Sequence, residues 1–96
     1  MAVTNAVIER VDTSSGIQVT LAGPDRNRRG LLIYNESAEI LFMACLDVVT
    51  ETEYTYPIKP GQAMNLRGNP IYVGIVTGKL DNAEVGAAAL VTEFYG

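Results

Sequence analysis

Two short apolar runs near the middle of the chain, residues 31–34 and 40–46, dominate the pattern of hydrophobic and polar positions. Each run is too short for an independent helix, is rich in Leu, Ile, Tyr and Phe, and has apolar residues on both faces of an extended strand. Residues 35–39 between them are polar and have turn composition. We therefore predict a β-hairpin that needs cover on both faces: the second sheet on one side, and a loop, an arm or another subunit on the other.

Alternating apolar and polar positions predict further strands on either side of this hairpin, with turn signals roughly every ten residues. Pro57 has no N–H for a strand ladder, so its strand should lie at a sheet edge or leave the sheet at that point. Pro60 and Gly61 suit the two corner positions of a type II turn. The further strands are predicted at 17–21, 54–58, 64–66, 71–76 and 86–95, with a turn region at 77–82. About seven short strands indicate an all-β domain over residues 16–96, either a single antiparallel β-sandwich or a small jelly-roll-like barrel.

Residues 1–15 have a less regular pattern. Val3, Val7 and Val11 recur at helical spacing, but the segment is rich in β-branched residues and runs into a polar stretch at 12–16. We interpret it as an N-terminal arm or a first strand.

Composition narrows the class of protein. A chain of 96 residues fits one domain with one core. The single cysteine, Cys45, excludes an internal disulfide, and the N-terminal residues contain Glu9 and Asp12 instead of an apolar block, so folding in a reducing cytoplasm is expected. No apolar run approaches the ~20 residues of a membrane-spanning helix, which predicts a soluble protein. The net charge of −4 argues against sequence-independent binding to nucleic acid.

Catalysis and metal binding find little support. The sequence has no histidine, which removes the commonest general base and every Ser-His or Cys-His pair. Cys45 lies in an apolar run and is interpreted as an inert core thiol. Acidic residues at 47–53 or 81–84 could supply oxygen ligands to Ca²⁺, but neither segment has the spacing of a known calcium loop, and solvated turn acids are the preferred interpretation. We expect no enzymatic activity, no cofactor and no metal.

A series of short motifs follows in order between about Val19 and Tyr95. The motifs are Arg29-Gly30-Leu31-Leu32-Ile33-Tyr34-Asn35, Leu41-Phe42-Met43-Ala44, Tyr54-Thr55-Tyr56-Pro57-Ile58, Pro60-Gly61, Asn69-Pro70-Ile71-Tyr72 and Leu90-Val91-Thr92-Glu93. Taken together they resemble small β-sandwich virion proteins of tailed bacteriophages, which are similar to capsid decoration or cement proteins. The resemblance implies a homodimer or homotrimer that binds the major capsid (coat) protein on the outside of the assembled shell and clamps adjoining coat subunits.

Two groups of residues are candidates for the coat-protein or subunit interface. Arg26, Arg28 and Arg29 are three of the seven basic residues and lie in a predicted polar loop. A nucleic-acid site would have aromatic residues between the basic ones, and this loop has none. Arginine pairs bidentately with carboxylates, so the loop either contacts another protein or is simply solvated. Tyr54 and Tyr56 are either interface anchors or half-buried residues of an edge strand.

Homo-oligomerisation is also expected from the apolar runs 31–34, 40–46 and 71–76, because a two-sheet sandwich buries only one face of each strand. A second class of function stays open: a binding module on the virion that recognises a host glycan or protein. The absence of tryptophan disfavours glycan binding, since sugar rings stack on large aromatic faces. A head-to-tail or tail component would share the same sequence features as a shell cement.

Overall fold

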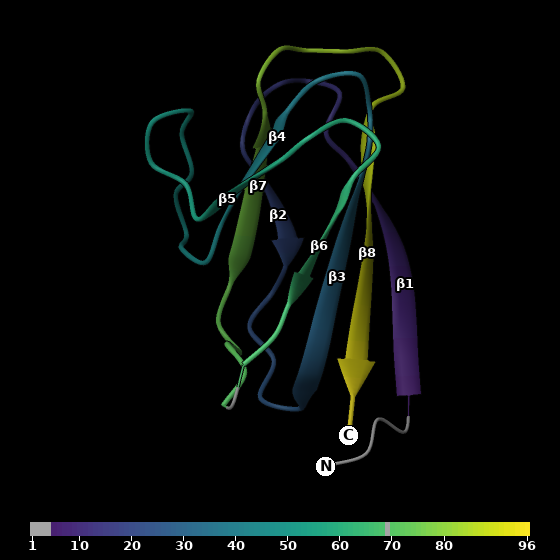
Figure 1. Cartoon of the computed structure of the whole chain (residues 1–96), viewed down its shortest axis with the longest axis vertical. Helices are drawn as coiled ribbons and strands as arrows, with labels where there is room; N and C mark the ends of the chain where they lie inside the picture. The colour runs from purple at the N-terminus through teal and green to yellow at the C-terminus, as the bar shows by residue number, and fades with distance from the viewer. Residues whose placement is uncertain (1–4, 69) are drawn as a thin grey trace.

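Eight β-strands and no helix make up the part of the chain that the computed structural model describes, residues 5–68 and 70–96. They are β1 (Asn5–Asp12), β2 (Val19–Ala22), β3 (Arg28–Glu36), β4 (Leu41–Ala44), β5 (Tyr56–Ile58), β6 (Ala63–Leu66), β7 (Val76–Leu80) and β8 (Ala88–Tyr95). Two antiparallel sheets pack face to face (Figure 1): sheet A in the order β1-β8-β3-β6, and sheet B in the order β2-β7-β4-β5. The predicted antiparallel β-sandwich is confirmed.

The core lies between the two sheets, where aliphatic side chains from both inner faces meet. Every second residue of a strand points to the same face, so each strand supplies alternate side chains to the core. Leu31 and Ile33 of β3 come from sheet A, Leu41 and Met43 of β4 come from sheet B, and none of the four has any exposed area. Full burial of a side chain of this size stabilises the fold by roughly 1.5–3 kcal/mol. The two central apolar runs therefore anchor opposite walls of one core.

Strands β3 and β4 do not form the predicted hairpin. β3 pairs with β6 and β8 in sheet A, whereas β4 pairs with β5 and β7 in sheet B. At the crossover, the buried side chain of Asn35 donates hydrogen bonds to the carbonyl oxygens of Glu39 at 2.7 Å and Ile58 at 2.9 Å. A polar turn between two apolar runs is compatible with a hairpin and with a crossover, so the hydrophobic pattern does not distinguish them.

The predicted strand at 71–76 is also wrong. Residues 71–75 are irregular, and β7 begins at Val76 and continues through the region of the predicted turn. Gly78 gives this region a turn-like composition, but its role is packing. A Cβ at Gly78 would lie 2.7 Å from Cδ1 of Leu21, so glycine lets the opposing Leu21 side chain seat against β7.

Several local predictions are confirmed. Residues 5–12 form neither a helix nor a free arm: they are the strand β1, which pairs with β8 along its whole length. The first four residues of the predicted N-terminal segment, Val3 included, lie outside the described residues, as does Asn69 of a predicted turn. β5, which contains Pro57, is an edge strand of sheet B. Gly61 has a φ of 70°, the left-handed conformation that the predicted turn requires.

The outer face of sheet B is covered by residues 45–55, which connect β4 to β5 (Figure 1). Val49, only 2% exposed, packs with Phe42 and Ala44 of β4 in a second hydrophobic cluster. Thr77 of β7 donates a hydrogen bond to the carbonyl oxygen of Leu46 at 2.9 Å, which ties the covering segment to the sheet. The apolar run at 40–46 therefore receives its second cover from a loop of its own chain.

Candidate functional site

The predicted contact residues fall in two separate regions of the molecule. Arg26, Arg28 and Arg29 belong to the β2–β3 connection and the start of β3, at the lower end of the sandwich in Figure 1. Tyr54 belongs to the β4–β5 connection, and Tyr56 belongs to β5, the edge strand of sheet B. The structure does not bring the two groups together into one site.

Arg28 is buried, with no exposed side-chain area. Its Nε lies 3.2 Å from Oε2 of Glu93, Nη1 donates to the carbonyl oxygens of Tyr72 at 3.2 Å and Gly74 at 3.0 Å, and Nη2 donates to that of Gly23 at 2.6 Å. These bonds join β3 and β8 to the loop after β2 and to the irregular segment before β7. Arg28 thus has no surface with which to contact another protein, and the expected surface loop of three arginines is corrected to Arg26 and Arg29.

Arg26 is exposed at the tip of this loop, whereas Arg29 is half-buried and donates to the carbonyl oxygen of Arg28 at 3.2 Å. The turn itself is closed by Asp25, whose Oδ1 accepts from the N–H of Asn27 at 2.9 Å. Arg26 is therefore the loop cation best placed to reach a carboxylate on another protein.

Tyr95 lies beside Arg28 in the register of β3 and β8. Burial, together with a hydrogen bond to Glu93, raises the pKa of Tyr95 to about 12. Sequence reasoning missed this cluster of Arg28, Glu93 and Tyr95. The available signal was Glu93 itself, which shares a strand face with the core residue Val91 and so needs a cationic partner.

The two tyrosines occupy different environments. Tyr54 is 42% exposed, and its ring packs against Phe42 on the outer face of sheet B with centroids 4.8 Å apart. Tyr56 is 49% exposed on the edge strand β5, where its register partner is the core residue Met43. Both rings combine an apolar body with a polar tip at the surface, but Tyr54 packs on the outer face of sheet B and Tyr56 lies on its edge strand.

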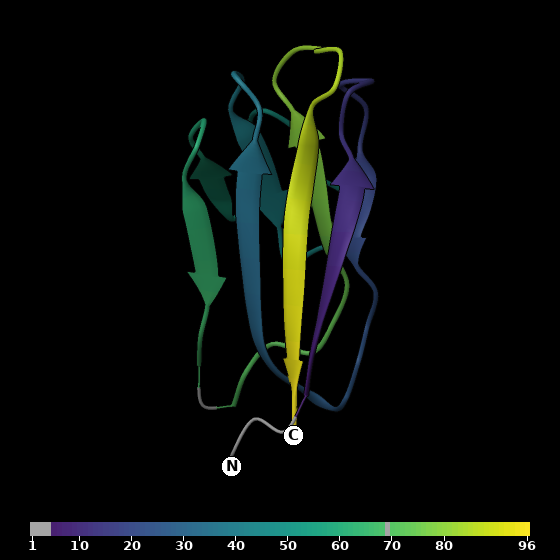
Figure 2. The same cartoon turned by 90° about the vertical axis from the view of Figure 1, so that its right-hand side faces the viewer.

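No described segment of the chain crosses the outer face of sheet A, which is turned toward the viewer in Figure 2. Ile8 is 71% exposed there and Tyr34 is 36% exposed, and Leu32, Leu90 and Phe94 are half-buried around them. The residues on this face alternate with the core residues of β3 and β8, so the apolar character on both sides of run 31–34 is real. Unlike sheet B, sheet A has no covering loop among residues 5–68 and 70–96.

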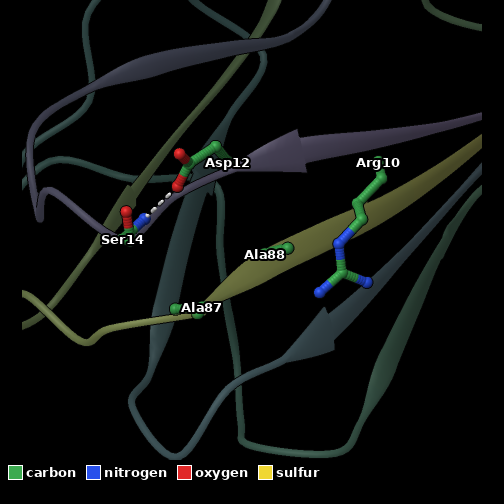
Figure 3. A pocket seen from close by; sticks show the side chains of 6 residues that line it. Arg10, Asp12, Ser14, Ala87 and Ala88 are labelled. Carbon is green, nitrogen blue, oxygen red and sulfur yellow. Dashed lines mark hydrogen bonds between the residues drawn. The ribbon is translucent and has the colours of Figure 1, made fainter.

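An open pocket of about 270 Å³ lies where β1 ends and β8 begins (Figure 3). It is lined by Arg10, Asp12, Ser14, Gly86, Ala87 and Ala88. Arg10 makes an ion pair with Glu36 at 2.7 Å, and Asp12 accepts from the N–H of Ser14 at 2.9 Å. Hydrogen bonds from Ser14 lower the pKa of Asp12, and the hydrogen bond from Arg10 lowers the pKa of Glu36. Both acids are therefore ionised, weakly basic groups, and the pocket is not arranged for proton transfer.

The remaining candidates for chemistry have structural partners. Burial raises the pKa of the Cys45 thiol, so it is protonated at neutral pH and a poor nucleophile. In the segment 81–84, the carboxylate of Glu84 accepts from the N–H of Ala38 at 2.9 Å. Across residues 5–68 and 70–96, no three side chains of His, Cys, Asp or Glu gather where they could hold a metal ion, and no helix is long and apolar enough to span a membrane.

No protein-family model, curated protein or solved structure matches this chain. The fold of the described residues therefore defines its class: a small antiparallel β-sandwich in which residues 45–55 cover the outer face of sheet B and no described segment covers that of sheet A.

Proposed function

We propose that this protein is a structural component of a tailed-bacteriophage virion, a capsid decoration or cement protein that binds the outside of the assembled shell and stabilises contacts between coat subunits. The observation that carries the proposal is the order of motifs from about Val19 to Tyr95. Three of these motifs coincide with strands that build the sandwich: residues 29–35 lie in β3, residues 41–44 are β4 and residues 90–93 lie in β8. The resemblance therefore involves positions that determine the fold, in addition to turn residues.

The mechanism of a cement follows from linkage. Its binding surface on the coat exists only where coat subunits meet, so every attached molecule adds its binding free energy to the assembled state. Arg26 supplies an exposed guanidinium for coat carboxylates, and Tyr54 and Tyr56 supply exposed aromatic anchors. These residues lie outside the open face of sheet A, which remains available for another copy of the chain in a homodimer or homotrimer.

Cosedimentation with coat-protein shells of the same virion tests the proposal. The protein should bind assembled, expanded shells, ignore isolated coat subunits, and raise the temperature at which shells come apart. Failure to bind shells, or equal binding to isolated coat subunits, would show that the protein is not a cement.

A pair of matched variants tests the contact residue. Arg26→Ala should weaken attachment by roughly tenfold or less, as expected for a cation at the rim of an interface, and the effect should shrink as salt rises. Lys59→Ala removes an exposed cation from the β5–β6 connection and should leave attachment unchanged. If Arg26→Ala binds like the unchanged protein, the coat contact is to be sought at Tyr54 and Tyr56.

A further inference from the structure

The outer edge of β1 is the longest uninterrupted strand edge among the described residues. The two sheets have four edge strands, β1 and β6 in sheet A and β2 and β5 in sheet B. β6 has four residues, β5 has three and contains Pro57, and β2 has four with an irregular register between Thr20 and Ala22. β1 has eight residues in unbroken register with β8, and no described strand lies beyond it (Figure 2). Natural sheets usually shorten or interrupt their edges, and β1 is the exception here.

Two hydrogen bonds at the ends of β1 show which of its backbone groups point away from β8. Just after β1, the N–H of Thr13 donates to the carbonyl oxygen of Ala87 at 3.2 Å. The N–H of Ala6, in contrast, donates to the side-chain Oδ1 of Asn5 at 2.9 Å. Alternate residues of an antiparallel strand bond to the same neighbour. The odd-numbered residues of β1 therefore bond to β8, and the even-numbered residues present their N–H and C=O groups at the open edge.

The side chains along this edge are exposed and carry both charges. Val7 is 50% exposed and Ile8 is 71% exposed, and Glu9 and Arg10 are also exposed. Glu9 projects to the same side of sheet A as its register partner, the core residue Val91. A strand that joins β1 brings one side chain directly opposite each of these residues. Glu9 disfavours any strand that places an apolar or acidic residue there, and Arg10 disfavours a basic one.

We propose that the edge of β1 binds an extended segment of another protein as an additional antiparallel strand of sheet A, and that this segment has a basic residue opposite Glu9 and an acidic residue opposite Arg10. Hydrogen bonds between the two backbones hold the segment, and the paired side chains select its sequence. The antiparallel direction is the more stable per residue and continues the pattern of the sheet. Apolar residues opposite Val7 and Ile8 complete the match.

A second copy of β1 does not have the required sequence. Residues that lie opposite one another share a face, so an antiparallel copy can bring only its odd-numbered residues opposite Glu9. Those of β1 are Asn5, Val7, Glu9 and Val11, none of which is basic. The Glu9 carboxylate would then lose hydration without gaining a cation. The charges of the edge therefore select a different protein as the partner.

A pair of capped peptides of identical composition tests the selection. The probe is Thr-Val-Glu-Lys-Ile-Val-Thr, whose first residue lies opposite Asp12 and whose Lys lies opposite Glu9. Titration into the isotope-labelled protein, followed by NMR, should shift the amide signals of β1, because its outward N–H groups gain acceptors. The control, Thr-Val-Lys-Glu-Ile-Val-Thr, exchanges the two charges and should bind roughly tenfold more weakly. Equal binding of the two peptides, or no shift with millimolar probe, would overturn the proposal.

N-methylation of the probe tests the backbone contribution. The N–H of the peptide Glu, opposite Arg10, points toward β1, whereas the N–H of the peptide Lys, opposite Glu9, points away. Methylation of the first nitrogen should abolish binding, and methylation of the second should leave it nearly unchanged. If both modified peptides bind alike, the peptide does not add as a strand.

Variants of the protein provide the last comparison. Glu9→Lys should weaken binding of the probe roughly tenfold. Asp81→Lys makes the same change of charge at an exposed position in the β7–β8 connection and should bind normally. If the β1 amide signals shift with protein concentration in the absence of peptide, a second copy takes the edge and the proposal is wrong. All of these measurements use the isolated protein, so this inference and the cement function can fail independently.

Discussion

At the scale of single residues, the most consequential side chain is Arg28. A guanidinium removed from water is costly unless hydrogen bonds and an opposite charge replace the lost hydration. Here the carboxylate of Glu93 and the carbonyl oxygens of Tyr72 and Gly74 take that role. The carbonyl oxygens of Tyr72 and Gly74 accept hydrogen bonds from the Arg28 side chain and are not available to a neighbouring strand. This explains why the apolar residues 71–75 do not form a strand.

Replacement of Arg28 should therefore be severe. Arg28→Met keeps most of the side-chain volume but leaves Glu93 and the carbonyl acceptors without their donor, and we expect the free energy of unfolding to fall by about 3–5 kcal/mol. Urea denaturation, monitored by circular dichroism, measures this free energy of unfolding. Arg26→Met, at an exposed position two residues earlier, should change stability by less than about 0.5 kcal/mol. A similar loss in both variants would contradict the structural role of Arg28.

Tyr95 predicts a pH dependence at the same end of the sandwich. Its pKa rises from 10 in the unfolded chain to about 12 in the folded protein, so above pH 10 the unfolded state releases a proton that the folded state retains. The stability that comes from neutral Tyr95 is therefore complete below pH 10 and is lost as pH rises toward about 12. Denaturation series over this range should show a smaller loss for Tyr95→Phe than for the unchanged protein. Equal losses would show that Tyr95 is not the responsible group.

At the scale of elements, the two sheets differ in how the outer faces of their central strands are covered. Each central strand carries apolar side chains on both faces and needs cover beyond the shared core. β4 obtains it from residues 45–55, where Val49 packs on Phe42 and Ala44. Among the described residues β3 has no such loop (Figure 2), and on its outer face Leu32 is half-buried and Tyr34 is 36% exposed. The covering segment therefore gives sheet B its second cover, while no described segment covers the outer face of sheet A.

Two neighbouring valines test the contribution of the covering segment. Val49→Ala removes two buried methyl groups and should lower the free energy of unfolding by about 2 kcal/mol. Val48 precedes it in sequence but is 57% exposed, so Val48→Ala should have an effect near zero. Chemical denaturation of both variants gives the comparison. If the two substitutions cost the same, residues 45–55 do not contribute to the core of sheet B as the structure indicates.

At the scale of the whole molecule, the topology makes folding depend on the end of the chain. β4 and β5 are the only consecutive strands that pair among those described, and β8 is inserted between β1 and β3. Sheet A thus cannot form until residues 88–95 are in place, and such distant pairings fold slowly because loop closure precedes any favourable contact.

A shortened chain tests this dependence. Residues 1–86 alone should be largely unfolded by circular dichroism, because β1 and β3 lose the strand that joins them. Addition of a peptide with the sequence of residues 87–96 should restore β structure, since it supplies β8 in trans. A chain of residues 1–86 that folds cooperatively without the peptide would show that sheet A does not require β8.

The class of fold was determined by local features of the sequence. Alternation with a period of two, the missing N–H of Pro57 and the conformational freedom of Gly61 act within a few residues, so they predict strands, an edge position and a turn without knowledge of the partner strands. The short apolar runs identified the walls of the core for the same reason.

Only the tertiary structure decided which strands pair, where Arg28 lies and how each second face is covered. These outcomes depend on residues far apart in the chain: Asn35 directs the crossover through Ile58, and Arg28 is buried because Glu93 and the carbonyl oxygens near Tyr72 converge on it. A hydrophobic pattern predicts which residues are buried, but it does not predict which residues they pack against. For run 40–46 the cover is a loop of the same chain, whereas no described segment covers the outer side of run 31–34.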